Sequence, residues 1–553
     1  AYVHPQAKIE SQPALQEIKH DVVNQDFTKA RLVIDHFPEL GVTEQKAILL
    51  ELSGAADAFA IPVLSYLLIK HPKTAARFPT ITDTILSKAV HSPNIVIHGL
   101  AGEGLEKFHY LKLAGELNLQ EAVPNLISLM LGLEEKPALL TVLTSLGTLG
   151  NPEAVNAVSE FLYVEDFDLL VAAVTALGRI ASSTALQRLA EFLGKDPKID
   201  HLILDVFAEV QDDFSLRKLN KTLQARSAPI RNHARAWLAA IGAKAVPLLI
   251  ENLSDSNNDL QILSLNVLQE IGDESAASAI RKLINNQPPN PNIRFAAFEA
   301  LAELSNRKGD YVLAGGIADP DSNVRLAAAK AIDRNLDATL ITGVMNMVEE
   351  PGDDAEYIIK AVIDAQAGNL FLGLIKSAGF KKRACTYLGQ DVHQDIREFF
   401  VKQLQDHNST ELANEILRLA QQQKKQVKGR VCAVDDSKVV LHIYRSVITE
   451  LGYDVVLFSE PLKAISWLQS EKPDFLCTDL NMPGVTGIEL IQEVRKKYNK
   501  DELPIILVTT QNEVRDNKAA REAGASEIMY KPFDTDMMST VFEKIKGGKT
   551  TKS

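Results

Sequence analysis

An internal repeat with a period of about 31 residues runs through the first part of this chain. An apolar residue that closes a helix-like segment recurs at steps of 30 to 33 residues, at Leu117, Leu149, Ile180, Val210, Ile241, Ile271 and Leu304. That period accommodates two short antiparallel helices and two turns. Because one such hairpin cannot bury its apolar face alone, neighbouring hairpins must stack to form a core. The repeat therefore predicts an all-α solenoid.

A second anchor of the repeat marks the start of a helix. It occurs as Ile230-Arg231, Leu260-Gln261, Ile293-Arg294 and Val324-Arg325. With the alanine-rich segment 326–332, these pairs make residues 105–335 similar to HEAT repeats. Residues 1–104 are expected to be divergent helical repeats, and residues 336–420 C-terminal repeats or a cap. The arginines fit either an anion-binding stripe or a ladder of ion pairs and helix-capping contacts, and the ladder is the favoured interpretation.

The composition of the chain limits the classes of partner. Hydrophobic residues make up 46% and charged residues 24% of its 553 residues, with a net charge of −13. This suits a globular protein that repels nucleic acid and anionic lipid. No stretch approaches the roughly 18 uninterrupted apolar residues of a membrane span. There is no signal-peptide core near the start, and the three cysteines show no metal-ligand spacing, so a cytoplasmic location is expected.

The sequence pattern changes after the polar segment 421–429, which is predicted to be a linker. Over residues 430–547, five short apolar runs alternate with helix-compatible segments; the runs are 431–434, 455–457, 475–477, 505–508 and 528–530. This alternation predicts an α/β domain with a parallel sheet covered on both faces. Functional groups in such folds gather beyond the carboxyl ends of the strands.

Polar residues follow four of these runs. Asp435 and Asp436 follow the first, Asp479 the third, Thr509 the fourth and Lys531 the fifth. Three carboxylates that lie together repel one another unless a cation compensates, and Mg²⁺ suits their oxygen ligands. Phosphoryl transfer needs mainly in-line positioning and charge neutralisation. The set therefore predicts a phosphoryl-accepting site that uses Mg²⁺, with Asp479 as the nucleophile.

The same residues are similar to the receiver domains of bacterial two-component response regulators, whose chemotaxis member has a flavodoxin-like, five-stranded sheet. The matching motifs are Val434-Asp-Asp436, Asp479-Leu-Asn-Met-Pro-Gly484, Val508-Thr509 and Lys531-Pro-Phe533. The resemblance implies phosphorylation of Asp479 and a cis Lys531–Pro532 peptide.

The resemblance also implies roles for individual residues. Mg²⁺ would be held by Asp435, Asp436, Asp479 and the backbone carbonyl of Asn481. Phosphate binding and switching would fall to Thr509, Thr510 and Lys531, and the switch region would include Ile528 and Tyr530. Asn481 and Gln511 stand at positions that tune dephosphorylation. Ile528 departs from the family, which usually has an aromatic residue there, and Thr510 stands where many members have a smaller one.

The expected function is that of a response regulator in a phosphorelay. A histidine kinase phosphorylates Asp479, and the receiver then switches the solenoid, a scaffold for an unknown protein partner. Pairing of receivers into a homodimer is left open. No enzymatic activity is expected beyond the receiver's own Mg²⁺-dependent phosphoryl transfer and dephosphorylation. The alternatives are a phosphate sink, a nucleic-acid-binding regulator, which the acidic composition disfavours, and an enzymatic repeat region, for which no constellation of Cys, His and acid stands out.

Overall fold

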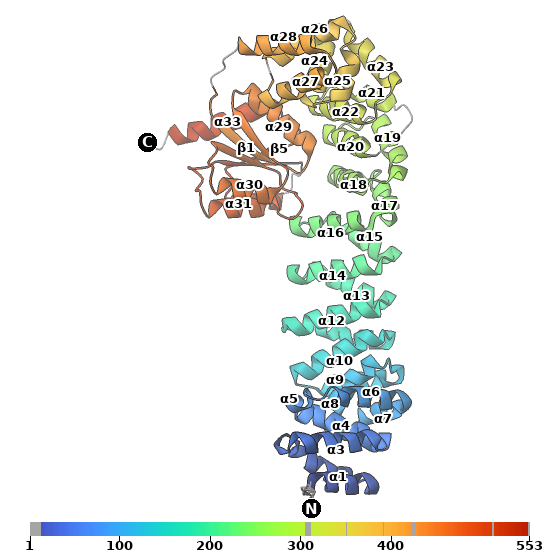
Figure 1. Ribbon diagram of the computed structural model, residues 1–553. Coiled ribbons are helices and arrows are strands. Elements are labelled where there is room, and N and C mark those ends of the chain that lie inside the picture. Colours follow the sequence, from blue (N-terminus) through green and yellow to red (C-terminus); the bar gives the residue numbers. More distant parts are fainter. Residues whose placement is uncertain are drawn as a thin grey trace, which may run out of the picture. The chain divides into compact units, whose positions relative to one another are not determined.

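The computed structural model describes residues 13–304, 311–349, 351–390, 392–422, 427–510 and 514–550. It divides into two compact units, Ala1–Ser215 and Leu216–Ser553. We call the helices α1–α28, which precede the first strand, the repeat region (Figure 1). The predicted linker falls partly on residues 423–426, which lie outside the described residues. No helix in the described ranges combines the length and hydropathy needed to cross a bilayer.

The first unit is helical throughout its described residues. The first helices of successive hairpins, α8, α10, α12 and α14, pack side by side. The helices are α1 (Pro13–Asn24), α2 (Phe27–Asp35), η1 (Phe37–Glu39), α3 (Val42–Gly54), α4 (Asp57–Lys70), α5 (Pro72–Ala75), α6 (Thr80–His91), α7 (Pro93–Gly99), α8 (Lys107–Glu116), η2 (Gln120–Ala122), α9 (Val123–Gly132), α10 (Lys136–Leu149), η3 (Pro152–Ala154), α11 (Val155–Glu160), η4 (Phe161–Tyr163), α12 (Phe167–Ile180), α13 (Ser183–Phe192) and α14 (Pro197–Val210).

Glycines in the first helices of these hairpins allow close packing. A Cβ atom placed on Gly147 of α10 would lie 2.8 Å from the Cα atom of Ala176 in α12. A Cβ atom placed on Gly178 of α12 would lie 2.6 Å from a side-chain methyl carbon of Val206 in α14. The repeated Leu-Gly pair of the sequence is thus explained by the distance between neighbouring hairpins.

The second unit begins within α15 (Asp213–Thr222), which spans the boundary between the units. Its further repeat helices are α16 (Ala228–Ile241), η5 (Gly242–Lys244), α17 (Val246–Asn252), α18 (Asn258–Ile271), η6 (Glu274–Ala276), α19 (Ala277–Asn285), α20 (Pro291–Glu303), α21 (Tyr311–Gly316), α22 (Ser322–Arg334), α23 (Ala338–Glu349), α24 (Asp353–Asp364), α25 (Gly368–Leu374), α26 (Ala378–Gln390), α27 (Gln394–Asp406) and α28 (Thr410–Gln421).

The ends of the repeat helices follow from local chemistry. Side-chain oxygens accept hydrogen bonds from backbone N–H groups at the starts of α12, α14, α18, α20 and α22, from Asp166, Asp196, Asn257, Asn290 and Asp321. The predicted closing residues are the last residues of α10, α12, α14, α16 and α18, and they cap α8 and α20. The predicted solenoid of helical hairpins is therefore confirmed.

The repeat arginines act as the ladder interpretation predicts at two positions. Arg294 Nε lies 2.8 Å from Asp319 Oδ2, and its Nη1 donates to the carbonyl of Pro288. Arg325 Nη1 donates to the carbonyls of Asp319 and Pro320. These contacts tie a helix start to the loop before it and to the next repeat.

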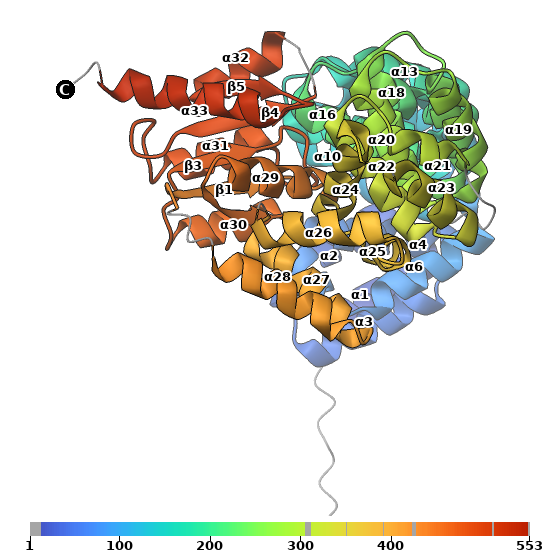
Figure 2. The same ribbon diagram turned by 90° about the horizontal axis from the view of Figure 1, so that it is seen from above.

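The α/β domain closes the second unit and contains a five-stranded parallel sheet in the order β2-β1-β3-β4-β5. The strands are β1 (Arg430–Val434), β2 (Asp454–Phe458), β3 (Phe475–Thr478), β4 (Ile505–Thr509) and β5 (Glu527–Tyr530). Helices α29 (Lys438–Glu450) and α33 (Thr535–Thr550) lie on one face of the sheet (Figures 1 and 2). The other face carries α30 (Pro461–Leu468), α31 (Gly487–Arg495) and α32 (Val514–Ala523). The predicted flavodoxin-like fold is confirmed.

The sheet is buried on both sides, which explains its continuous apolar runs. All residues of β3 and β4 are buried, and Leu476, Leu507 and Leu490 belong to the core under α30–α32. Helix α29 also packs against α22 and α24 of the repeat region. Because all five strands are parallel, their carboxyl ends lie at a single edge of the sheet, which we call the carboxyl edge.

Candidate functional site

The carboxyl edge brings together the polar residues that the sequence places after the strands. Asp435 and Asp436 follow β1, Asp479 follows β3 and Lys531 follows β5. Thr509 differs from the expectation, because it is the last residue of β4 and is buried within it. Parallel pairing of Val434 with Thr478 sets Asp435 and Asp479 beside each other. We call Asp435, Asp436 and Asp479 the acidic cluster.

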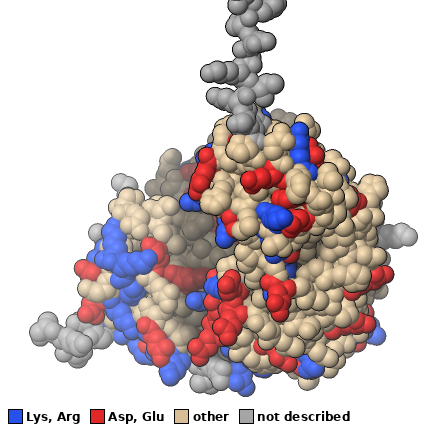
Figure 3. Space-filling view, turned by 90° about the horizontal axis from the view of Figure 1, so that it is seen from below, with Lys and Arg blue, Asp and Glu red and all other residues tan. Residues whose placement is uncertain are grey.

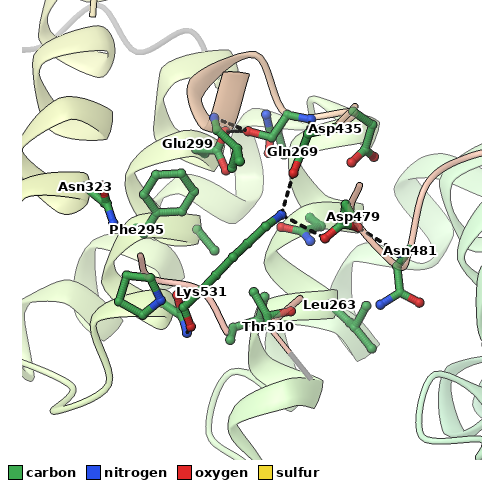
Figure 4. Close-up of a pocket in the computed structure, with 18 of the residues that line it drawn as sticks. Leu263, Gln269, Phe295, Glu299, Asn323, Asp435, Asp479, Asn481, Thr510 and Lys531 are labelled. Carbon is green, nitrogen blue, oxygen red and sulfur yellow. Dashed lines mark hydrogen bonds and ion pairs between the residues drawn. The ribbon is translucent and has the colours of Figure 1, made fainter. Parts of the chain in front are cut away.

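Lys531 pairs with two members of the acidic cluster (Figure 4). Its Nζ lies 2.7 Å from Asp435 Oδ2 and 2.8 Å from Asp479 Oδ1. The other carboxylate oxygen of Asp479, Oδ2, accepts a hydrogen bond of 2.7 Å from the backbone N–H of Asn481. The Asp479 carboxylate is thus held at both oxygens.

Burial dominates the electrostatics of the cluster. It raises the pKa of Asp435 to about 8, against the opposing charge of Lys531 and with the help of Asp479 and Asp436. The pKa of Asp436 is raised as well, mainly by burial. Burial disfavours the charged form of Lys531, but Asp435 and Asp479 outweigh it and raise the pKa of the ammonium. Burial thus works against the charged form of all three of these groups, and the positive charge of Lys531 opposes that effect on the two carboxylates.

The third carboxylate is paired with a residue from the repeat region. Arg235 of α16 places Nη2 at 3.3 Å from Asp436 Oδ2, and its Nε at 3.4 Å from Glu270 of α18. Burial works against its charge, but Asp436 and Glu270 raise the pKa of the guanidinium. Sequence reasoning did not identify Arg235, because Ala234-Arg-Ala-Trp237 reads as an ordinary stretch of repeat helix.

Two further helices of the repeat region, α20 and α22, contact loops at this edge, and a second residue of α16 contacts α32. In α20, Glu299 Oε1 accepts a hydrogen bond of 2.5 Å from Ser437 Oγ, and Asn292 Nδ2 donates to the carbonyl of Lys531 at 2.6 Å. In α22, Asn323 Nδ2 donates to the carbonyl of Phe533 at 3.2 Å. Arg231 of α16 forms a buried ion pair of 2.8 Å with Asp516 of α32.

A cavity of about 410 Å³ lies between these helices and the carboxyl edge. The repeat region contributes Arg235, Glu270, Asn292 and Glu299, among others, and the α/β domain contributes the whole acidic cluster, Asn481, Thr510 and Lys531 (Figure 4). Six carboxylate side chains line it, together with two cationic ones; the acids are Glu270, Glu299, Glu303, Asp435, Asp436 and Asp479. The cavity is therefore electronegative and favours cations.

Basic side chains gather elsewhere on the α/β domain. Figure 3 shows lysine and arginine side chains over its outer surface, where α30 and the region of α31 carry the exposed Lys463, Lys496, Lys497 and Lys500. None of these four residues lines the cavity.

The remaining predicted residues lie around the same edge. Thr510 lines the cavity, and the backbone carbonyl of Thr509 accepts a hydrogen bond from the Lys531 N–H. Ile528 packs against the core, and Tyr530 Oη accepts a hydrogen bond of 2.7 Å from Asn517 of α32. The Lys531–Pro532 peptide is cis, as the resemblance implied. Gln511 lies outside the described residues.

The acidic cluster suits a divalent cation in its donor chemistry, since carboxylate oxygens are the ligands that Mg²⁺ prefers. Its arrangement, however, is that of a cluster neutralised by side chains. Within the ranges that the structure describes, no three His, Cys, Asp or Glu side chains are grouped to hold a metal ion. Lys531 and Arg235 stand between the carboxylates instead.

Comparison with known families agrees with this architecture. Residues 431–543 match the model of the response regulator receiver domain, and residues 123–203 and 246–333 match HEAT repeats.

Several solved structures are similar to about a fifth of the chain. The chemotaxis response regulator CheY4 of Vibrio cholerae is 26% identical, with 21% of this chain and 97% of that chain covered and a TM-score of 0.20. The receiver domain of a sensor histidine kinase from Pseudomonas aeruginosa, reported with a magnesium ion coordinated in the active site cleft, is 23% identical, with 22% and 98% covered and a TM-score of 0.21. The BeF3-activated DrrB receiver domain is 21% identical, with 22% and 97% covered and a TM-score of 0.20.

The fold, the residues at its carboxyl edge and the two family models agree. The chain therefore joins HEAT repeats to a C-terminal response regulator receiver domain.

Proposed function

We propose that this protein is a response regulator of a two-component pathway in which a histidine kinase phosphorylates Asp479. Phosphorylation then switches the repeat region, which serves as a scaffold for a protein partner. The observation that carries the proposal is the bridge from Lys531 to both Asp435 and Asp479 at the carboxyl edge of a receiver domain.

The geometry of Asp479 suits a nucleophile. Asp479 is only 6% exposed and lines the cavity, and Lys531 and the Asn481 N–H fix the orientation of its carboxylate. In the proposed step an Asp479 oxygen forms a bond to phosphorus while the bond from phosphorus to the imidazole nitrogen of the donor breaks. The electron pair of that bond returns to the imidazole. Lys531 neutralises charge on the phosphoryl oxygens, which is the main help that such a transfer needs.

We expect Mg²⁺ to be held by Asp435, Asp436 and Asp479 with the backbone carbonyl of Asn481. When bound, the ion supplies positive charge to the phosphoryl oxygens. Three carboxylates from the ends of two neighbouring strands support this assignment, and burial raises the pKa of Asp435 with the help of Asp479 and Asp436, so a bound cation would stabilise the charged carboxylates. The magnesium ion reported in the receiver domain from Pseudomonas aeruginosa supports it as well. Thr509 and Thr510 are the proposed phosphoryl-contacting hydroxyls.

Direct contacts support the coupling of the acceptor site to the repeat region. Arg235 reaches Asp436, and Asn292 hydrogen-bonds the backbone of Lys531. Phosphorylation turns the Asp479 carboxylate, of charge −1, into an acyl phosphate of about −1.5 to −2, and this added charge and bulk can change the balance between two arrangements. The switch proposal depends on these contacts, because they join the two regions at the site of modification.

Intact mass measurement tests the acceptor. The full chain is incubated with acetyl phosphate and Mg²⁺, and the wild-type protein is expected to gain the mass of one phosphoryl group. Asp479→Asn is expected to gain none, whereas the control Asp501→Asn, at an exposed position of the same domain, gains it like the wild type. Uptake by Asp479→Asn equal to that of the control would show that another residue is the acceptor.

A pull-down tests the scaffold. Wild-type protein and Asp479→Asn are compared with and without beryllofluoride and Mg²⁺, and a partner is expected to distinguish the two states of the wild type only. A set of partners that never changes among these four samples would contradict the switch.

A further inference from the structure

We propose that Arg235 is an internal counter-ion of the acidic cluster, and that its guanidinium competes with a divalent cation for Asp436. The inference deepens the proposed function and rests on it, since it takes Asp436 as a ligand of the metal. It adds to the receiver a residue from α16 of the repeat region that controls metal loading.

The position of Arg235 carries the first step of the argument. Its Nη2 lies 3.3 Å from Asp436 Oδ2, and its side chain is 14% exposed. Mg²⁺ binds carboxylate oxygens at about 2.0–2.1 Å and demands nearly octahedral geometry. A guanidinium has only donors and a fixed positive charge, so it cannot join the ligands of a metal. Two cations so close to one carboxylate repel each other strongly in a buried site.

Charge balance carries the second step. The three carboxylates of the acidic cluster face two side-chain cations, Lys531 and Arg235. Within these five charges alone, leaving aside Glu270 and the other glutamates of the cavity wall, adding a divalent cation leaves one positive charge in excess. Replacing Arg235 by the divalent cation leaves three negative and three positive charges. Metal loading is therefore favoured when Arg235 withdraws from Asp436.

Arg235 has an alternative partner within the repeat region. Its Nε lies 3.4 Å from Glu270 of α18, although this buried nitrogen makes no hydrogen bond in the present arrangement. A small shift of the guanidinium toward Glu270 would improve that contact and release Asp436. The side chain therefore need not lose all its ionic contacts when the metal binds.

The two equilibria are linked in both directions. If the contact between Arg235 and Asp436 weakens metal binding by some factor, metal binding weakens that contact by the same factor. Loading of the receiver therefore loosens α16 at the carboxyl edge. The ion pair between Arg231 and Asp516, one helical turn away, does not involve the cluster and would remain.

Calorimetric titration of the full chain with Mg²⁺ tests the competition. We expect Arg235→Met and Arg235→Gln to bind Mg²⁺ about tenfold more tightly than the wild type, within the range usual for coupled sites. Arg294→Gln is the matched control, because Arg294 pairs with Asp319 inside the repeat region, and it should keep the wild-type affinity. Adding Asp436→Asn should abolish the difference between wild type and Arg235→Met.

A second readout follows α16 itself. Hydrogen exchange in peptides from α16 is expected to rise when the wild type is saturated with Mg²⁺, and to be insensitive to Mg²⁺ in Arg235→Met. Circular dichroism establishes that each variant is folded. If Arg235→Met does not fold, Arg235→Gln and the exchange measurement on the wild type still decide.

The outcomes separate the inference from the proposed function. If the Arg235 variants bind Mg²⁺ no more tightly than the wild type does, while Asp436→Asn still weakens Mg²⁺ binding, the competition is overturned. The proposed metal site of the receiver domain then stands. Absence of Mg²⁺ binding in every variant and the wild type overturns the competition together with the proposed metal site.

Discussion

In the acidic cluster, the ammonium of Lys531 pairs with two buried carboxylates and the guanidinium of Arg235 pairs with the third. Removing charged groups from water costs several kcal/mol per ion, so such a set is stable only when each charge has a close partner. Here the partners come from the loops after β3 and β5 and from α16. The acidic cluster is therefore neutralised in part by Arg235, which precedes Asp436 by 201 positions in the chain.

A second buried acid joins the repeat region to the receiver domain. Asp364 of α24 accepts hydrogen bonds from Ser446 of α29 and Tyr387 of α26. Burial raises its pKa to about 6 from the usual 3.8, against the effect of Lys360 and these hydroxyls. Because the folded state holds the proton more tightly than the unfolded state, the stability that this group contributes is fully present below about pH 4 and is lost as pH rises through about 6.

Replacing this acid by its neutral analogue should remove that pH dependence. We expect Asp364→Asn to match the wild type near pH 4 and to exceed its free energy of unfolding by up to about 3 kcal/mol near pH 8. Urea unfolding at several pH values measures the difference. Asp353→Asn, exposed on the same helix, is the control and should show little pH-dependent difference. A constant difference between Asp364→Asn and wild type would contradict the assignment.

Single residues were predictable where a motif fixes them. The acids after β1 and β3 and the lysine after β5 were placed from the sequence because the end of a parallel strand determines where the next side chain lies. The contact of Arg235 with the cluster could not be predicted in this way, because it depends on which face of α16 meets the receiver domain. No periodicity in the sequence encodes that contact.

At the scale of elements, the spacing between hairpins depends on glycine. Gly147 of α10 faces the backbone of Ala176, where an added Cβ would lie 2.8 Å from Cα. A backbone atom cannot rotate away as a side chain can, so α10 and α12 would have to separate.

We therefore expect Gly147→Ala to lower the free energy of unfolding by about 1–3 kcal/mol, the usual cost of overpacking. Gly132→Ala is the control: an added Cβ at the end of α9 meets nothing within 4 Å, so that variant should match or slightly exceed the wild type. Thermal unfolding by circular dichroism compares them. Equal stability of the two variants would show that the hairpins adjust at no cost.

The bounds of strands and helices were the features most predictable from the sequence. All five strands were predicted within one residue at each end, because continuous apolar runs of this length suit a sheet covered on both faces. The helix ends of the repeats followed from a recurring apolar residue. Thr509 shows the limit of such patterns, since an apolar run does not reveal that the next polar residue still pairs within β4.

In the second unit, the repeat helices α20 and α22 contact the loop after β5, beside the proposed acceptor Asp479. Asn292 and Asn323 donate hydrogen bonds to the carbonyls of Lys531 and Phe533. These bonds fix α20 and α22 on the loop after β5. If the helices limit access to Asp479, weakening both bonds should increase the fraction of open molecules.

We expect the double variant Asn292→Ala and Asn323→Ala to take up phosphoryl groups from acetyl phosphate about 2- to 10-fold faster, in proportion to its open fraction. The rate is measured by intact mass over time. Asn258→Ala, exposed at the start of α18, is the control. An unchanged rate despite faster hydrogen exchange in the loop after β5 would show that these helices do not limit access.

The packing of the repeat helices against the receiver domain in the second unit was the feature least predictable from the sequence. The sequence identified a helical repeat and a receiver domain separately, but contacts between them join residues far apart in the chain, such as Ser446 with Asp364 or Asn323 with Phe533. Such pairings depend on complementary surfaces, which a single sequence does not display.

The cavity over Asp479 sets a size limit on what can deliver a phosphoryl group. Its volume of about 410 Å³ is close to that of a single turn of helix with its side chains, given a diameter of about 10 Å and a pitch of about 5.4 Å. A small acyl phosphate fits inside, whereas a histidine carried on a kinase helix needs room for its whole scaffold. We therefore expect both kinds of donor to react faster when α20 moves away from the carboxyl edge, and donors of the second kind to need the wider opening.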